Sequence, residues 1–197
     1  MYTNYQNLYK QLMNVYPLDE AKAIVRMVLE ERYGLTLAEI YTDKVTQLSA
    51  DDANDLEKIM SRLEKGEPVQ YVLGSTTFCG RQFCVAPGVL IPRPETEMLC
   101  EWVINVHNNS FCALQPPTPL RILDVGTGSG CIAITLSLDM SNTVVSAYDI
   151  SSEALLIARD NAIRLGATVN FQMKDSLQLV TTSEIFDVIV SNPHYIC

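Results

Sequence analysis

The 197-residue sequence predicts an α/β protein, in which a small helical domain and a β-hairpin linker precede a parallel sheet wound by helices. Three observations predict this architecture. Apolar residues recur at helical spacing as far as about Lys65, short β-prone runs follow up to Val85, and strands alternate with helices from Leu120 onward. Hydrophobic residues make up 48% of the chain, which is enough for a buried core.

The first predicted domain is helical and covers residues 1–66. Ser49 stands just before its last helix and is followed by acidic residues, a pattern typical of a helix N-terminus. Gly66 and Pro68 end that helix. The apolar positions form three groups at helical spacing: Tyr5, Leu8, Tyr9 and Leu12; Ala21, Ile24, Val25, Val28 and Leu29; and Ala53, Leu56, Met60 and Leu63.

Residues 67–94 are predicted to form the β-hairpin linker. Short strands are predicted from the β-prone runs at 69–73, 76–78 and 82–85, and Gly80 suits the hairpin turn. Prolines then give an extended lead-in to a helix from about residue 95 to 106. The polar, proline-rich residues 107–119 are predicted to form a surface loop.

The third predicted domain covers residues 95–197 and contains the sheet. Strands are predicted at 121–125, 143–149, 168–173 and 186–192, with helices from Ser129 and over residues 152–164. Because these strands are short, rich in β-branched residues and alternate with helices, they indicate a parallel sheet covered by helices.

Charge and cysteine content restrict the possible partners. A formal charge of −9 disfavours a polyanionic backbone, so no direct nucleic-acid partner is expected. The six cysteines contain no C-x-x-C pair and only two histidines accompany them, so we expect reduced thiols in a cytoplasmic protein and no metal. No apolar run is long enough for a bilayer, and the N-terminus lacks a signal-peptide pattern, so no membrane partner is expected.

A glycine-rich turn follows the first strand of the predicted sheet, where missing β-carbons let a ligand lie against the backbone. Its residues are Gly126, Thr127, Gly128, Ser129 and Gly130. Asp149 ends the next strand, where a carboxylate can accept hydrogen bonds from both ribose hydroxyls of a nucleoside. Asp175 follows the third strand at the same edge and suits the exocyclic amine of an adenine. A turn formed for packing and a solvated aspartate are the alternative interpretations.

The spacing of the turn distinguishes between nucleoside cofactors. A dinucleotide needs its third glycine one position later, where Cys131 stands. The carboxylate of Asp124, just before the turn, would repel a pyrophosphate and suits a cationic ligand. S-adenosylmethionine carries a sulfonium and an ammonium group, and it is therefore the predicted cofactor.

Three further strings resemble known methyltransferases. The fourth strand ends in Asn192-Pro193-His194-Tyr195, which resembles the Asn-Pro-Pro-Tyr motif of enzymes that methylate planar amino groups. The strings E-P-V-Q-Y-V-L-G at 67–74 and I-P-R-P-E-T-E at 91–97 are similar to those of the release factor glutamine N5-methyltransferase family (HemK/PrmC type). The resemblance extends from the helical domain to Tyr195.

This resemblance implies a fold and an activity. Residues 95–197 would form a Rossmann-like class I methyltransferase domain, and the helical domain would bind the release factor. The expected reaction transfers a methyl group from S-adenosylmethionine to the side-chain amide nitrogen of the glutamine in the Gly-Gly-Gln motif of peptide chain release factors.

The resemblance also implies roles for individual residues. It places the cofactor on residues 126–130, Asp149 and Asn192, with Asp175 and Ser176 near the adenine. The side-chain oxygen of Asn192 and the carbonyl of Pro193 would accept the two N–H bonds of the target amide, and Tyr195 would pack against its plane. His194 would lie in this substrate loop at a position where the family has proline, which removes a restriction on the conformation of Pro193.

Other interpretations stay open at this point. The N-P-x-Y loop alone also fits an amino-methyltransferase that acts on adenine in DNA or RNA. A catalytically impaired fragment that only binds the release factor is a further possibility. Arg93, Glu95 and Glu97 fit either a salt-bridged helix start or a position next to the cofactor.

The resemblance bears on the C-terminal end of the sheet as well. Members of the resembled family continue past the loop, so the sheet is expected to be incomplete, with an open strand edge and little activity in the 197-residue chain.

Overall fold

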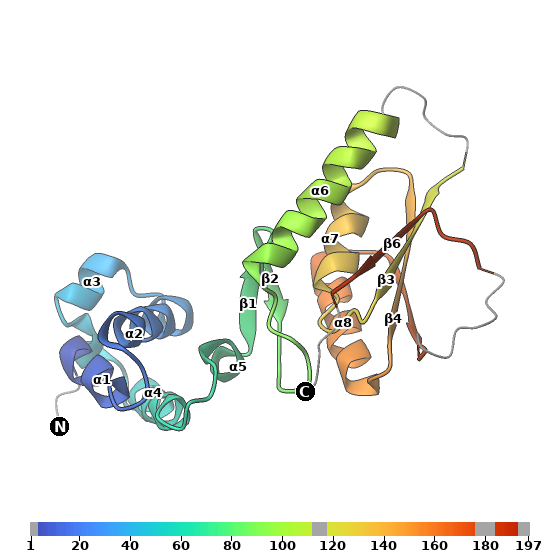
Figure 1. Ribbon diagram of the computed structural model, residues 1–197. Helices are drawn as coiled ribbons and strands as arrows, with labels where there is room; N and C mark the ends of the chain where they lie inside the picture. Colours follow the sequence, from blue (N-terminus) through green and yellow to red (C-terminus); the bar gives the residue numbers. More distant parts are fainter. Residues whose placement is uncertain (1–3, 112–117, 176–183, 193–197) are drawn as a thin grey trace. The chain divides into compact units, whose positions relative to one another are not determined.

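The computed structural model describes residues 4–111, 118–175 and 184–192, and the chain forms two compact units, Met1–Gly74 and Ser75–Cys197 (Figure 1). None of the described helices is both long and apolar enough to cross a membrane. Each unit contains its own cluster of buried apolar side chains, so each is described by itself.

The first unit consists of helices. They are α1 (Tyr5–Leu12), α2 (Leu18–Tyr33), α3 (Leu37–Tyr41), the 3-10 helix η1 (Lys44–Gln47), α4 (Ala50–Leu63) and α5 (Val69–Leu73). The three predicted helices are confirmed as α1, α2 and α4, and the Ser49 hydroxyl caps α4 by accepting from the backbone N–H of Asp52. Their apolar faces form the core, with Leu8, Leu12, Leu29 and Leu63 at most 1% exposed.

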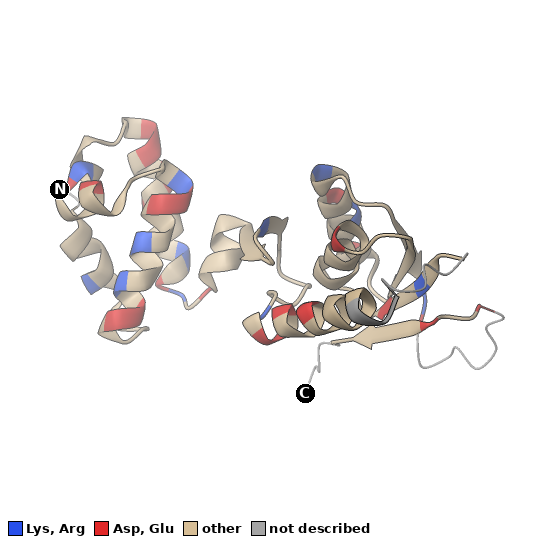
Figure 2. Cartoon of the chain, turned by 90° about the horizontal axis from the view of Figure 1, so that it is seen from above, with Lys and Arg blue, Asp and Glu red and all other residues tan. Residues whose placement is uncertain are grey.

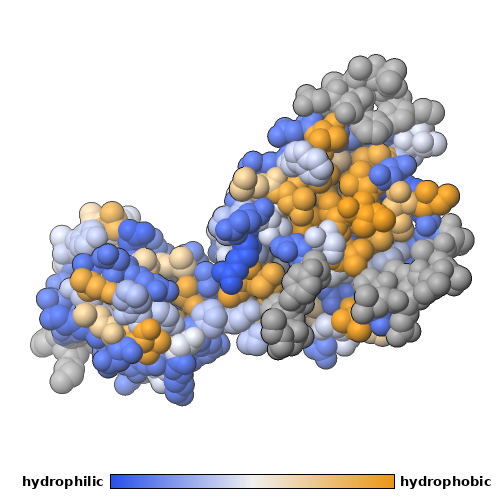
Figure 3. Space-filling model, viewed as in Figure 1, coloured by the Kyte–Doolittle hydropathy of each residue, from blue (hydrophilic) through white to orange (hydrophobic). Residues whose placement is uncertain are grey.

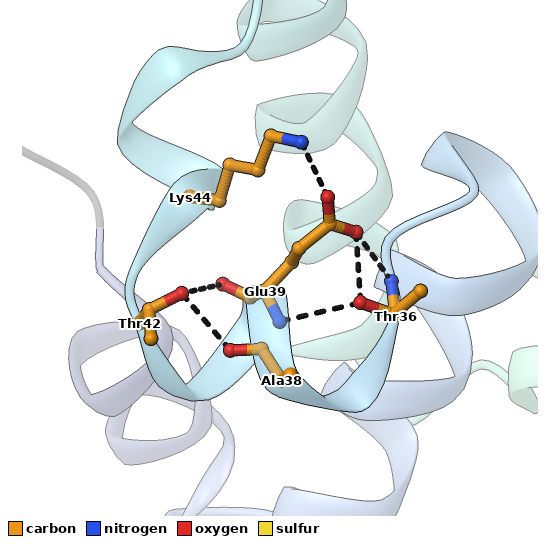
Figure 4. A network of polar contacts seen from close by, with 5 residues as sticks. All are labelled: Thr36, Ala38, Glu39, Thr42 and Lys44. Atoms are coloured by element: carbon orange, nitrogen blue, oxygen red, sulfur yellow. Dashed lines mark hydrogen bonds and ion pairs between the residues drawn. The ribbon is translucent and has the colours of Figure 1, made fainter.

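Helix α3 has only five residues and depends on contacts at its ends (Figure 4). Thr36 and Glu39 form a capping box: Glu39 Oε2 accepts from the Thr36 backbone N–H at 2.9 Å, and Thr36 Oγ1 accepts from that of Glu39 at 3.4 Å. Lys44 pairs with the same carboxylate, and this ion pair and the threonine contacts lower the pKa of Glu39 to about 2. At the other end, Thr42 Oγ1 donates to the carbonyls of Ala38 and Glu39.

The prediction of a strand at residues 69–73 is wrong, because this segment forms helix α5. Pro68 precedes it with a φ of −55°, which suits a helix start, and Gly74 ends it in the left-handed region at a φ of 76°. The Arg62 guanidinium donates to the carbonyls of Tyr71 and Val72, each at 3.2 Å. These end contacts outweigh the β propensity of the valines.

The second unit begins with the predicted hairpin. Strands β1 (Ser75–Phe78) and β2 (Arg81–Cys84) pair antiparallel. The two turn residues, Cys79 and Gly80, have φ of 45° and 72°, as a two-residue turn of this kind requires.

Helix α6 follows the hairpin and spans Pro94–Phe111. It continues into the segment predicted as a loop, and residues 112–117 of that segment lie outside the described residues. Acidic residues, red in Figure 2, stand at the beginning of α6, where Glu95 and Glu97 occupy the first turn and suit the helix dipole.

The predicted parallel sheet is confirmed. Strands β3 (Leu120–Val125), β4 (Thr143–Asp149), β5 (Val169–Met173) and β6 (Val188–Ser191) are all parallel, in the order β5-β4-β3-β6. Helices α7 (Cys131–Asp139) and α8 (Ser152–Leu165) connect the first three. Figure 1 shows α6, α7 and α8 on one face of this sheet. There the side chains of Ile122, Val145 and Val190 join the apolar core.

The opposite face and the β6 edge are less covered. Within the described ranges β6 pairs with β3 alone, and Ile189 of β6 is 64% exposed. Figure 3 shows hydrophobic surface gathered around this side of the unit. The expectation of an open strand edge therefore agrees with the described part of the sheet.

Candidate active site

A cavity of about 340 Å³ lies at the carboxyl ends of β3, β4 and β5. This edge is where open parallel sheets bind their ligands. The glycine-rich turn, the end of β4 and the segment before α6 contribute to its wall. Of the residues predicted for the site, those that line the cavity are Gly126, Thr127, Gly128, Ser129, Asp149, Asp175 and Asn192. Ser176, Pro193, His194 and Tyr195 lie outside the described residues.

The glycines of the turn have different tasks. Gly126, Gly128 and Gly130 all have positive φ, between 55° and 81°, which favours glycine. A β-carbon on Gly128 would meet nothing within 4 Å, so the turn leaves open space beside its backbone. On Gly130 it would lie 2.9 Å from Ile134 Cδ1 and 3.1 Å from Ala158 Cβ. Gly130 does not line the cavity, and it permits the close packing of α7 against α8.

Asp124 lies beneath the turn and does not line the cavity. Its side chain is fully buried, and Oδ2 accepts from Thr127 Oγ1 at 2.7 Å and from the Ala133 backbone N–H at 3.3 Å. Its Oδ1 has no hydrogen-bond partner among the described residues. Burial raises the pKa of this carboxyl to about 6. Asp124 therefore holds the turn in shape, and any effect of its charge on a ligand acts through space.

Asp149 contacts two neighbouring backbone segments at the end of β4. Its Oδ2 accepts from the Gly128 backbone N–H at 2.8 Å, and its Oδ1 accepts from that of Ser151 at 2.9 Å. Each carboxylate oxygen can accept a second hydrogen bond. The side chain is thus held in one orientation and keeps capacity for the hydroxyls of a ligand. Ile150, which is 70% exposed, lines the cavity beside it and offers an apolar surface.

The sequence pattern did not predict a polar cluster beside the cavity. Lys174, just after β5, donates to Tyr148 Oη at 2.9 Å and to Glu184 Oε2 at 3.2 Å, and the Tyr148 hydroxyl also binds Glu184. The hydrogen bond to Tyr148 is the largest cause that raises the pKa of Lys174. Such a cluster depends on which strand ends are neighbours, so residue types alone do not reveal it.

Asn161 of α8 links the hairpin to the glycine-rich turn and is 1% exposed. Its side-chain Nδ2 donates to the carbonyls of Cys84 at 3.0 Å and Ser129 at 2.9 Å, and its Oδ1 accepts from the Cys84 backbone N–H at 2.7 Å. This single buried amide therefore binds three backbone groups, of which the Ser129 carbonyl is buried. It fixes the position of the turn relative to β2.

Asn192 follows β6 and reaches the beginning of α6. Its Nδ2 donates to Thr96 Oγ1 at 2.7 Å, and Thr96 also lines the cavity. Next to it, Glu97 accepts a 2.6 Å hydrogen bond from the Cys79 backbone N–H in the hairpin turn. The carboxylate of Glu97 thus binds the hairpin turn, a contact that neither interpretation of Glu97 included, while its place in the first turn of α6 agrees with a helix start.

The lining of the cavity fits the predicted cofactor. Two carboxylates, Asp149 and Asp175, lie in its wall, and within the described part of the chain Lys174 is the one cationic side chain there. Because Lys174 is paired with Glu184, the wall lacks the positive charge that a pyrophosphate needs. A nucleoside with a cationic amino-acid end suits this charge distribution better.

Two family models match the chain: the PrmC N-terminal domain at residues 5–74 and the methyltransferase small domain at residues 111–195. The chain is 43% identical over 190 residues to the release factor glutamine methyltransferase of Bacteroides thetaiotaomicron. This match covers 95% of this chain and 64% of that protein. The protein of the same name from Koribacter versatilis is 45% identical, over 81% of this chain and 54% of that protein. The protein of the same name from Flavobacterium psychrophilum is 37% identical, over 98% of this chain and 67% of that protein. The chain therefore spans between 54% and 67% of the length of these relatives.

Proposed function

This chain belongs to the release factor glutamine methyltransferase family, and we propose that it methylates the side-chain amide nitrogen of the glutamine in the Gly-Gly-Gln motif of peptide chain release factors. The observation that carries the proposal is the cavity, which the glycine-rich turn, Asp149 and Asn192 line together. A transfer reaction needs the groups for cofactor and target in one cavity.

The cofactor is S-adenosylmethionine, which supplies an electrophilic methyl group when it is bound. Asp149 would accept hydrogen bonds from the ribose hydroxyls, since its carboxylate is already oriented by Gly128 and Ser151. The open backbone at Gly128 would leave room for the amino-acid end. Asp175, with Ser176 after it, would contact the adenine, and Ile150 would lie against the base.

Asn192 would orient the target amide. An amide nitrogen is conjugated and therefore a poor nucleophile, so it reacts only when its face is directed at the methyl group. The side-chain oxygen of Asn192 and the carbonyl of Pro193 would accept its two N–H bonds, and Tyr195 would pack against its plane. His194 would form part of the same loop. Methyl transfer in line needs orientation more than a strong base, so we assign no general base.

The remaining parts of the chain have proposed roles as well. The helical domain, residues 1–66, would bind the release factor. Residues 67–94 would link this domain to the methyltransferase domain, residues 95–197, which would catalyse the transfer. We propose a protein substrate and no direct nucleic-acid partner, because the chain carries a formal charge of −9. We also propose a cytoplasmic location, where the free thiols of Cys79, Cys84, Cys100 and Cys131 stay reduced.

The test uses purified chain, S-adenosylmethionine with a labelled methyl group, and candidate release factors, with the label located by mass spectrometry. Label on the glutamine amide, and none on a release factor with that glutamine replaced by alanine, is expected. RNA and DNA are added in parallel, and label on adenine there would favour the amino-methyltransferase alternative. Binding of the cofactor is measured by calorimetry, because a chain that binds it without turnover is the impaired fragment.

The variant Asn192→Ala tests the role of Asn192 in the same assay. It should nearly abolish methyl transfer, in this chain or in a longer relative, while it keeps much of the affinity for the cofactor. Full turnover by the variant would contradict the role given to Asn192.

A further inference from the structure

Thr96, in the first turn of α6, contacts the side chain of Asn192 across the fold. The distance from Asn192 Nδ2 to Thr96 Oγ1 is 2.7 Å, although 96 positions separate the two residues in the sequence. Both line the cavity, but Thr96 is only 5% exposed whereas Asn192 is an exposed residue. A buried hydroxyl group therefore holds a side chain that would otherwise rotate freely in the cavity.

In the contact that the structure shows, Nδ2 is the end of the Asn192 amide that Thr96 binds. A primary amide has an acceptor oxygen at one end and two N–H donors at the other. Since Nδ2 faces Thr96, the oxygen Oδ1 is the end left for a ligand. Without the threonine hydroxyl, neither end of the amide would be held by Thr96, and the group could rotate about its last side-chain bond.

The hydroxyl of Thr96 is itself held at a fixed place. Threonine is branched at its β-carbon, and few side-chain conformations are open to it in a helix. The Thr96 backbone N–H donates to the Arg93 carbonyl at 2.9 Å, and the neighbouring Glu97 is bound by the Cys79 backbone N–H at 2.6 Å. On the other side, Ser191 Oγ donates to the Val125 carbonyl at 2.8 Å and fixes the backbone just before Asn192.

We propose that Thr96 is a positioning residue for methyl transfer, which binds Nδ2 of Asn192 so that Oδ1 is directed at the N–H groups of the target amide. The proposal rests on the function proposed above, in which Asn192 is an acceptor for that amide. A misoriented acceptor affects the transition state more than cofactor binding, so loss of the hydroxyl should lower kcat roughly 10- to 100-fold. The affinity for S-adenosylmethionine should change little.

The kinetic test compares three variants with the wild-type chain. Thr96→Val removes the hydroxyl at nearly constant volume and should show the lowered kcat with little change in the Kd of the cofactor. Thr96→Ser restores the hydroxyl and should recover most of the rate. Thr135→Val is the matched control, because Thr135 is a buried threonine of α7 that does not line the cavity. Equal kcat for Thr96→Val and wild type would overturn the proposal.

A second measurement is independent of turnover. The side-chain amide of Asn192 gives a pair of signals in the ¹⁵N-edited NMR spectrum, which Asn192→Asp identifies by their loss. Thr96→Val should shift these signals and speed the hydrogen exchange of Nδ2, whereas Thr96→Ser and Thr135→Val should not. Unchanged signals in Thr96→Val would overturn the proposed contact. If the wild-type chain labels no glutamine, the proposed function fails, and the NMR result still decides whether Thr96 orients Asn192.

Discussion

Asp124 illustrates, at the scale of one residue, how burial makes the stability of the fold depend on pH. Its pKa rises to about 6 from an ordinary value of 3.8, mainly because the carboxylate is desolvated. The folded state therefore keeps the proton to higher pH than the unfolded chain does. The stabilisation from this group is fully present below about pH 4 and is lost as the pH rises through 6.

We predict that Asp124→Asn removes this dependence, because asparagine does not titrate and can still accept from Thr127. The difference in free energy of unfolding, wild type minus variant, should fall by as much as about 3 kcal/mol between pH 4 and pH 7. Urea denaturation at pH 4, 5.5 and 7 measures it, with Asp51→Asn on the exposed surface of α4 as the control. A difference that stays constant with pH would contradict the prediction.

Asp149 leads to a prediction about binding at the same scale. Asp149→Ala should weaken the binding of S-adenosylmethionine by roughly 1–3 kcal/mol, because it removes charge-assisted hydrogen bonds to the ribose and frees the backbone N–H of Gly128. Titration calorimetry measures the change in Kd. Asp160→Ala, on the exposed surface of α8, should leave the affinity as it is. If Asp149→Ala also leaves it unchanged, Asp149 is only a solvated strand end.

At the scale of elements, the residues at helix ends account for the short helices of the first unit. Helix α3 is too short to persist alone, and its capping box supplies partners for its first N–H groups. Thr36→Ala should therefore destabilise the helical unit by about 1 kcal/mol. Thr36→Ser, which keeps the hydroxyl, should cost much less, and Thr168→Ala in the second unit serves as the control. Circular dichroism during urea denaturation measures the three variants, and equal midpoints would exclude a role for the cap.

The elements also show what the sequence could and could not predict. The alternation of strands and helices could be predicted from the sequence, because buried parallel strands are apolar and the glycine-rich turn marks a strand-to-helix connection. Helix α5 was mispredicted because Val69 and Val72 favour strands, while the contacts that form the helix come from Arg62. The five residues of α3 are too few to show a period.

The same distinction holds for the candidate site. Asp149 and Asn192 could be predicted because they stand at the carboxyl ends of β4 and β6, the two strands that flank β3, and a parallel sheet places such ends along one edge. Thr96 and Asn161 could not be predicted, since their partners lie 96 and 77 positions away in the sequence. Only the folded chain reveals these contacts.

At the scale of the whole molecule, the two units should differ in local stability. The helices of the first unit surround a closed core, whereas β6 pairs on one side only within the described residues and exposes Ile189. Unpaired strand edges open easily and promote aggregation. The 197-residue chain is therefore expected to be poorly soluble or only partly cooperative in its second unit.

Hydrogen exchange followed by mass spectrometry tests this expectation. Amides of the edge strand β6 should exchange much faster than those of α2 and α4. Peptides from β4, which lies between β3 and β5, serve as the internal reference for a strand paired on both sides. Protection of β6 equal to that of β4, together with full methylation of a release factor, would contradict it and would point to a second copy paired along this edge.

The order of the strands has a consequence for how the chain is assembled during synthesis. β3 is the first strand of the sheet to be made, yet it lies between β4 and the last described strand, β6. The Arg121 backbone N–H finds its carboxylate partner, Asp187, 66 residues later, and Asn192 reaches back 96 residues to Thr96. Contacts between distant residues close slowly, whereas local helical contacts form early. The helical unit can thus fold while the rest is being translated, and Thr96 and Asn192 come together only after β6 has been made.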